Sequence, residues 1–221
     1  MNWDMNDKKT TRFMEQNIHN LAFAQFEGEG KYDIPKMLPT TIDRDILENT
    51  PLQGFNFALK ETNADLKACH FFLHDYQFER VWNYPARYVK VLSQFAYVLS
   101  PDFSPYGDMP KATQIMNVYR NRWCGRYWQE HGIEVIPTLT FGSEESLIDF
   151  CMDGIPKHST IAISTMGEGR WGDYKLLKKS WNKIMKRLEP DIIILYGKDL
   201  SSELSGNIIY KPMTSKEVRK K

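Results

Sequence analysis

Residues 174–197, YKLLKKSWNKIMKRLEPDIIILYG, decide the fold class. Apolar side chains recur at helical spacing along 174–189, which predicts an amphipathic helix. Pro190 cannot continue that helix, and the run at 192–195 is apolar at every position, as expected for a strand covered on both faces. A helix that leads directly into such a strand predicts βαβ units and a parallel sheet.

Strand signals continue toward the N-terminus, as far as about residue 53. Each is a short apolar run bounded by polar or turn-forming residues. Pro137 lies inside one run, which indicates an edge strand or a bulge. Seven segments are predicted as strands: 54–59, 68–74, 96–100, 133–141, 160–165, 191–197 and 207–212.

Three further helices are predicted between these strands. The first covers 78–92, where Pro85 has to kink the helix or begin a second piece. The second covers 111–131, and Gly132 is well placed as its C-terminal cap. A short third helix begins after the N-cap candidate Ser143.

The elements together predict an α/β fold with a mainly parallel sheet of six or seven strands and βαβ crossovers. The sheet is either doubly wound or barrel-like, and both forms place function at the carboxyl ends of the strands. Residues 1–50 are predicted to form an N-terminal arm or small subdomain that packs on the main body, including a short helix around 12–26. The α/β domain then covers 51–214, and 215–221 form a charged C-terminal tail.

Composition excludes several functional classes. The net charge is +1, from 29 basic and 28 acidic residues, so no overall attraction to nucleic acid or membrane is expected. The N-terminus has no secretory signal, and the apolar runs are too short to span a bilayer. The three cysteines, Cys69, Cys124 and Cys151, form no CxxC pair and are expected to be reduced. We therefore expect a cytoplasmic protein without a membrane partner.

Two aspartates follow neighbouring predicted strands. Asp75 comes directly after 68–74, and Asp102 comes just after 96–100. Carboxylates that converge at one sheet edge can act as acid and base or ligate a hard cation, and each raises the pKa of the other. The alternative is that they only cap helices and build turns. Asp108, with Pro110 behind it, is expected to do only that as an N-cap. Asp75 and Asp102 are the predicted catalytic pair.

The predicted substrate is anionic. A polar strip on the helix over 111–131 begins one turn from the strand ends, where the helix dipole favours an anion. The alternative for this strip is a solvated face with internal ion pairs. The predicted substrate-binding residues are Arg80, Tyr106, Gln114, Asn117, Arg120, Arg170 and Trp171.

The segment GEGRWG at 167–172 matches the dinucleotide fingerprint G-x-G-x-x-G. It comes late in the chain, Glu168 would lie beside the pyrophosphate, and no acidic residue ends the next strand at the expected spacing. We favour a flexible loop over the site, with Arg170 and Trp171 at its tip. Spacings typical of metal ligands are absent, since His70 and His74 would lie about 13 Å apart along a strand. No metal is predicted, and the cofactor stays unidentified.

Much of the chain resembles the family named domain of unknown function 4417. The resemblance covers roughly residues 52–212, and its most specific motifs are PDFS, YRNRW and DGIPK. It implies, by association, a setting in bacteria, phages and mobile elements, and it brings no assigned activity. Three stretches carry it: HFFLHDYQFERVWNYPARYV (70–89), LSPDFSPYGDMPKATQIMNVYRNRWCGRYWQEHGIEVIPTLTF (99–141) and CMDGIPKHSTIAISTMG (151–167).

Two functions from different classes remain open. The first is an enzyme or binder for an anionic small molecule, such as a nucleotide, or for a nucleic-acid end. The second is a non-enzymatic accessory factor that binds nucleic acid or protein. It would use Arg120, Arg122, Arg126 and the basic helix face over 175–187. A shared pocket for the two aspartates favours the first function, and a continuous positive surface favours the second.

Overall fold

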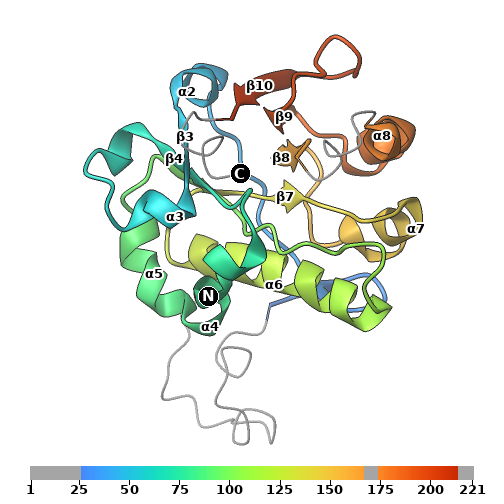
Figure 1. The fold of residues 1–221 in the computed structure, drawn as a ribbon, viewed down its shortest axis with the longest axis horizontal. Coiled ribbons are helices and arrows are strands. Elements are labelled where there is room, and N and C mark those ends of the chain that lie inside the picture. The colour runs from blue at the N-terminus through green and yellow to red at the C-terminus, as the bar shows by residue number, and fades with distance from the viewer. Residues whose placement is uncertain (1–25, 167–173, 214–221) are drawn as a thin grey trace, which may run out of the picture.

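The computed structural model describes residues 26–166 and 174–213 and contains two four-stranded parallel sheets (Figure 1). The first sheet has the order β3-β4-β5-β6, and the second has the order β10-β9-β8-β7. The strands of the first sheet are β3 (Leu52–Gly54), β4 (Ala68–His70), β5 (Tyr97–Leu99) and β6 (Val135–Ile136). Those of the second are β7 (Thr138–Leu139), β8 (Thr160–Ser164), β9 (Ile192–Gly197) and β10 (Ile208–Pro212).

Helices connect these strands. The expected helix over 78–92 consists of two helices. The second begins at Pro85, which was one of the two outcomes predicted for this proline. The helices over 111–131 and 174–189 are confirmed, and Gly132 follows the former with a φ of 75°. The α-helices are α2 (Arg44–Asn49), α3 (Phe55–Ala58), α4 (Glu79–Asn83), α5 (Pro85–Leu92), α6 (Lys111–Glu130), α7 (Glu144–Ser146) and α8 (Lys175–Leu188). Short 3-10 helices η2 (Ala64–Leu66) and η3 (Asp75–Gln77) and the π-helix η4 (Leu147–Cys151) complete the set.

Pro137 divides the segment 133–141, which was expected to form one strand. Proline has no N–H group to donate to a ladder, and β6 pairs with β5 whereas β7 pairs with β8. The expected sheet of six or seven strands is therefore replaced by two parallel sheets of four. The strands follow one another in chain order, without the reversal of a doubly wound sheet. Within the described residues β3 and β10 do not pair, so no barrel is closed.

Two further strand predictions were wrong over most of their length, since β3 ends at Gly54 and β4 ends at His70. The segment 54–59 is a helix from Phe55 onward, because a short apolar run fits helical spacing as well as alternation. The segment 68–74 leaves the sheet after His70, whose ring nitrogen Nδ1 accepts a hydrogen bond from the Phe72 backbone N–H at 3.2 Å. Such local side-chain bonds compete with sheet pairing.

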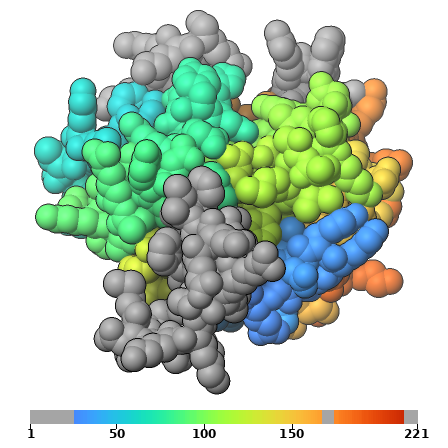
Figure 2. Space-filling model, turned by 90° about the horizontal axis from the view of Figure 1, so that it is seen from below, coloured from blue at the N-terminus to red at the C-terminus, as the bar shows by residue number. Residues whose placement is uncertain are grey.

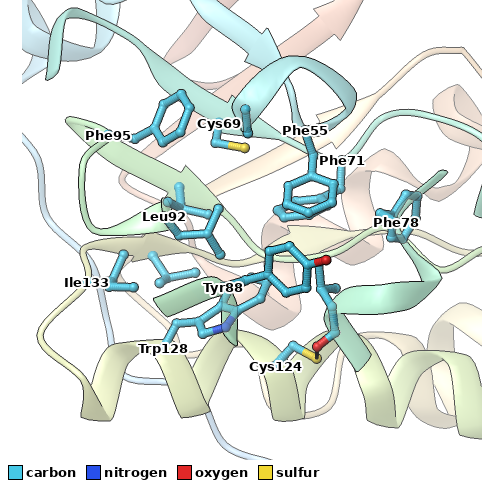
Figure 3. Close-up of a cluster of buried hydrophobic side chains, with 14 of the residues drawn as sticks. Phe55, Cys69, Phe71, Phe78, Tyr88, Leu92, Phe95, Cys124, Trp128 and Ile133 are labelled. Carbon is cyan, nitrogen blue, oxygen red and sulfur yellow. Dashed lines mark hydrogen bonds between the residues drawn. The ribbon is translucent and has the colours of Figure 1, made fainter. Parts of the chain in front are cut away.

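The two sheets share one apolar core. Alternate residues of each strand point to it, for example Leu99 of β5, Ala162 of β8 and Ile194 of β9. The remaining strand residues face helices. On the first sheet they pack against α4, α5 and α6, and the Phe71 and Trp128 rings stack with centroids 5.6 Å apart (Figure 3). The second sheet packs against α8 in the same way.

The described part of the predicted arm packs on the main body. A hairpin of β1 (Gly28–Glu29) and β2 (Ile34–Pro35) lies against α6, as the blue and yellow-green surfaces in Figure 2 show. The Nζ of Lys211 in β10 donates to the carbonyl oxygens of Glu48 (2.8 Å) and Thr50 (2.9 Å), at the end of α2. The edge strand β10 is thereby connected to the segment that leads into β3. The expected helix over 12–26 and the tail over 215–221 lie outside the described residues, and the domain boundary at residue 50 stays a prediction.

None of the helices in 26–166 and 174–213 combines the length and apolar character needed to cross a bilayer.

Candidate functional site

A pocket of about 380 Å³ opens where β4, β5, β7 and β8 end. This volume lies in the range of small-molecule sites, roughly 300–1,000 Å³. The pocket lies at the carboxyl ends of the strands, where parallel α/β proteins have their functional sites. Its polar lining includes Asn56, Gln77, Asp102, Ser104 and Thr140, and its apolar lining includes Phe72, Leu139, Phe141, Ile163 and Leu177.

Asp102 lines this pocket in the loop that follows β5. Its Oδ1 atom is buried and has no hydrogen-bond partner in the part of the chain that the structure describes. Burial raises the pKa of Asp102 well above its ordinary value, and the charge of Asp75 raises that pKa further. A hydrogen bond from Thr140 and the charge of Arg122 act in the opposite direction. Asp102 therefore holds its proton at a pH where an exposed aspartate has lost it.

Asp75 has a different role at the same place. It lies at the start of η3, and its Oδ1 and Oδ2 atoms accept hydrogen bonds from the Ser104 hydroxyl and backbone N–H, each at 3.1 Å. Asp75 thus fixes the loop that carries Asp102 and lies close enough to influence the pKa of that residue. The structure brings the two predicted carboxyl groups together, with only Asp102 in the pocket lining.

The polar strip on α6 holds the same loop. The Gln114 side-chain amide donates to the Met109 carbonyl at 2.8 Å, and the Asn117 amide donates to the Ser104 carbonyl at 2.7 Å. Asn121, which sequence reasoning missed, is fully buried: its Oδ1 accepts from the Phe103 N–H and its Nδ2 donates to the Phe103 carbonyl. Each of these three amides therefore donates to the backbone of the loop, and Asn117 in addition accepts a hydrogen bond from Arg120. The strip is neither a solvated face nor exposed to the pocket mouth.

Asp108 does not cap the helix as expected. The helix begins at Lys111, the residue in the N-cap position is Pro110, and no side chain caps it. The helix starts two residues later than an Asp108 cap would require, because Pro110 disfavours a helical backbone at the residue before it, Met109. Ser143, in contrast, caps α7 as predicted, with Ser146 completing a reciprocal pair of hydrogen bonds.

The other predicted substrate-binding residues are spread more widely. Arg120 donates to Glu79 (2.7 Å) and to Asn117 (2.6 Å), and its guanidinium group stacks on the Phe103 ring. Arg80 packs over the Phe55 ring, and neither arginine is in the pocket lining.

Tyr106 lines the pocket and is 51% exposed. Arg170 and Trp171, with the whole GEGRWG segment, lie outside the described residues. Their predicted part in binding stays a prediction.

Two glycines allow the pocket loops to touch, and sequence reasoning missed both. A Cβ atom on Gly142, in the loop after β7, would lie 2.1 Å from the Pro105 carbonyl oxygen and 2.5 Å from the Gly107 nitrogen. One on Gly107 would lie 2.8 Å from the Gly142 carbonyl oxygen. Only glycine fits at such contacts. The loops after β5 and β7 therefore form one wall.

Most basic residues of the accessory-factor hypothesis bind other groups within the protein. Arg122 was expected on a binding surface and is instead buried, with its guanidinium group bound to the carbonyl oxygens of Asp153, Thr138 and Cys151. Burial lowers its pKa to about 10. Arg126 pairs with Glu130.

On α8, Lys179 and Lys183 both pair with Glu144, and they lower the pKa of that carboxyl group to about 2. Lys178 pairs with Glu203. Glutamate side chains from other segments therefore form ion pairs with lysines on the helix face over 175–187.

No three histidine, cysteine, aspartate or glutamate side chains in 26–166 and 174–213 come together as metal ligands. His70 is fully buried in the core, where its ring lies against that of Tyr196. The three cysteines are buried free thiols.

Fold and pocket define the class: a parallel α/β protein with a carboxyl-lined pocket at the ends of its strands. The chain belongs to the family described as "Domain of unknown function (DUF4417)", whose model matches residues 26–210.

Two phage proteins are similar over most of the chain. The "Gene 1 protein" of Mycobacterium phage L5 is 42% identical over 184 residues, which cover 82% of this chain and 77% of that protein. The "Gene 1 protein" of Mycobacterium phage D29 is 39% identical over 185 residues, which cover 82% of this chain and 66% of that protein. No solved structure matches. The family resemblance is therefore confirmed, and both of these similar proteins come from phages.

Proposed function

We propose that this phage-type protein is an enzyme that binds a small molecule in the pocket and transfers a proton through Asp102. The observation that carries the proposal is the buried Asp102 Oδ1 atom, which lines a pocket without a hydrogen-bond partner among the described residues. An unsatisfied buried polar atom costs about 1–3 kcal/mol. A ligand or a reaction explains such a group where it lines a pocket, as Asp102 does.

The two aspartates have complementary parts in this proposal. Asp102 carries the proton and donates it to the ligand as a general acid, because burial favours its neutral form. Asp75 is a positioning residue that holds the Ser104 backbone and keeps the Asp102 loop in place. Its negative charge also favours the protonated form of Asp102.

An anionic group on the ligand belongs at the mouth of the pocket. The described lining contains no lysine or arginine, and Arg120 already has carboxylate and amide partners. The exposed His74 and the lining residue Met166 mark the mouth. We assign the anion to that side and the reacting atoms to the interior.

Nucleoside monophosphates and their nucleosides test the proposal in thermal-shift and turnover assays. We expect one or more to raise the melting temperature of the wild type, and Asp102→Asn to bind it but to lose turnover by at least about 100-fold. Asp108→Asn is the matched control, because Asp108 lies in the same loop, is exposed and is not in the pocket lining. Equal turnover by Asp102→Asn would contradict the proposal, as would the failure of these compounds and of every other small molecule tested to bind.

A further inference from the structure

We propose that the pocket recognises a flat heteroaromatic ring of the nucleobase class, through a donor–acceptor edge that Asn56 and Asp102 read together. This inference names the class of substrate for the proposed function. It rests on that proposed function, in which the pocket binds a ligand.

Two buried oxygen atoms carry the inference. The Oδ1 atoms of Asn56 and of Asp102 are each buried and without a hydrogen-bond partner in the described part of the chain, and both residues line this pocket. A ligand that bonded to both would remove two desolvation penalties of about 1–3 kcal/mol each. Among the described residues that line the pocket, these two therefore have the buried side-chain oxygen atoms that still lack a hydrogen bond.

The two groups follow strands that flank β4. Asn56 lies in α3 immediately after β3, and Asp102 follows β5. Strands β3 and β5 both pair with β4. Because both side chains line the same pocket, one ligand can contact both of them.

The chemistry of the two side chains specifies the ring edge. A carboxamide offers both donor and acceptor atoms, and a neutral carboxyl group does the same. The ligand edge that complements these side chains has an N–H group beside a C=O group, as in guanine, hypoxanthine and uracil. Asn and Asp side chains are the amide and carboxyl groups that read base edges in nucleic-acid recognition.

The walls of the pocket suit flat apolar faces. Phe72 comes from the segment after β4, Leu139 and Ile163 from the second sheet, and Leu177 from α8. Apolar and aromatic side chains are the usual contacts of ring faces. A sugar or a short hydroxy acid would place hydroxyl groups against these walls, where they would lose hydrogen bonds to water.

Calorimetric titration with guanosine, inosine and uridine tests the inference against benzimidazole riboside, which keeps a bicyclic ring and the sugar but lacks the N–H and C=O edge. We expect the wild type to bind at least one of the three nucleosides tenfold or more tightly than the benzimidazole compound. Asn56→Leu should lose at least tenfold in affinity and still fold, because it removes an unsatisfied buried group. Asn83→Leu, on the exposed end of α4, is the control.

Failure of the inference is distinguishable from failure of the proposed function. If other small molecules bind in the pocket and are turned over through Asp102, but the nucleosides bind no better than benzimidazole riboside, the ring-edge assignment is wrong and the proposed function stands. Unchanged nucleoside affinity in Asn56→Leu likewise overturns the assignment. If no compound binds at all, both fall.

Discussion

Asp102 differs in its surroundings from the carboxylates that form ion pairs with lysine. Glu61 is bonded to Lys67, and Glu144 is bonded to two lysines, so the pKa of each is lowered. Asp102 is buried beside another acid, and its pKa is raised. A carboxyl group that no cation neutralises at close range is suited to proton transfer rather than to structural ion pairing.

The pH dependence of stability tests this difference. Below the ordinary aspartate pKa of 3.8, Asp102 is neutral in both the folded and the unfolded chain. As the pH rises above that value, the unfolded chain ionises first, so the wild type loses stability up to the raised folded-state pKa. The side chain in Asp102→Asn cannot ionise, so this variant is expected to be the more stable protein at pH 7. Its free energy of unfolding should be higher by about 1.4 kcal/mol for each unit by which folding raises the Asp102 pKa. The advantage should disappear near pH 4.

Urea unfolding of both proteins at pH 4 and pH 7 measures the effect, with Asp108→Asn as the control. An identical loss of stability in wild type and Asp102→Asn between the two pH values would show that Asp102 ionises normally.

Some site residues could be predicted from the sequence and others could not. Asp75 and Asp102 were identifiable because each follows an apolar strand segment. Asn56 and Thr140 were missed because they lay inside segments interpreted as strands. The pairing of Arg120 with Glu79 could not be foreseen, since 41 residues separate them.

At the scale of elements, the loop after β5 is fixed from two sides. Three amides of α6 bind its backbone, and Asp75 binds it from the neighbouring strand end. The loop after β7 closes the wall through its contact at Gly142. The pocket shape therefore depends on backbone contacts that leave no room for added side-chain atoms.

Gly142→Ala tests this dependence. The new methyl group would overlap the Pro105 carbonyl, so the two loops must separate, at a cost of about 1–3 kcal/mol in the free energy of unfolding. We expect the affinity for any pocket ligand to fall along with stability. Gly132→Ala is a useful comparison, because its Cβ would meet nothing within 4 Å although its φ of +75° is unfavourable for alanine. It should destabilise without loss of binding. Unchanged binding in Gly142→Ala would contradict the two-loop wall.

Helices were more predictable than strands. The helix over 174–189 has a full amphipathic pattern, which the structure confirms. Strands β3 and β4 have only three residues each, so period-two alternation had too few positions to show where they end. The division at Pro137 was signalled by the proline, but its consequence, two sheets rather than one, depends on tertiary pairing.

At the scale of the whole molecule, one apolar core lies between the two sheets, and two further clusters join the sheets to the helices. Residues from strands of both sheets contribute to it. No ladder joins β3 to β10 in the described chain, and the bonds from Lys211 to the end of α2 connect the two edges instead. We infer that α2 and Lys211 stabilise the open side of the fold.

Lys211→Met should therefore destabilise the protein by about 1–3 kcal/mol, because the Glu48 and Thr50 carbonyl groups lose their donor. Hydrogen exchange is expected to accelerate in both β10 and β3 rather than in β10 alone. Lys186→Met, on the exposed face of α8, is the control. Exchange that accelerates only in β10 would show that the two edges are independent.

The most direct test of the account is a carbon-13 NMR titration of the Asp102 carboxyl group in the wild type and in Asp75→Asn. We expect a wild-type midpoint well above 3.8, because burial is the largest cause of the shift. In Asp75→Asn the midpoint should fall, since the neighbouring charge is removed, but should stay above 3.8. A wild-type midpoint at 3.8 would contradict the account, because Asp102 would then be an ordinary ionised aspartate with no proton to transfer.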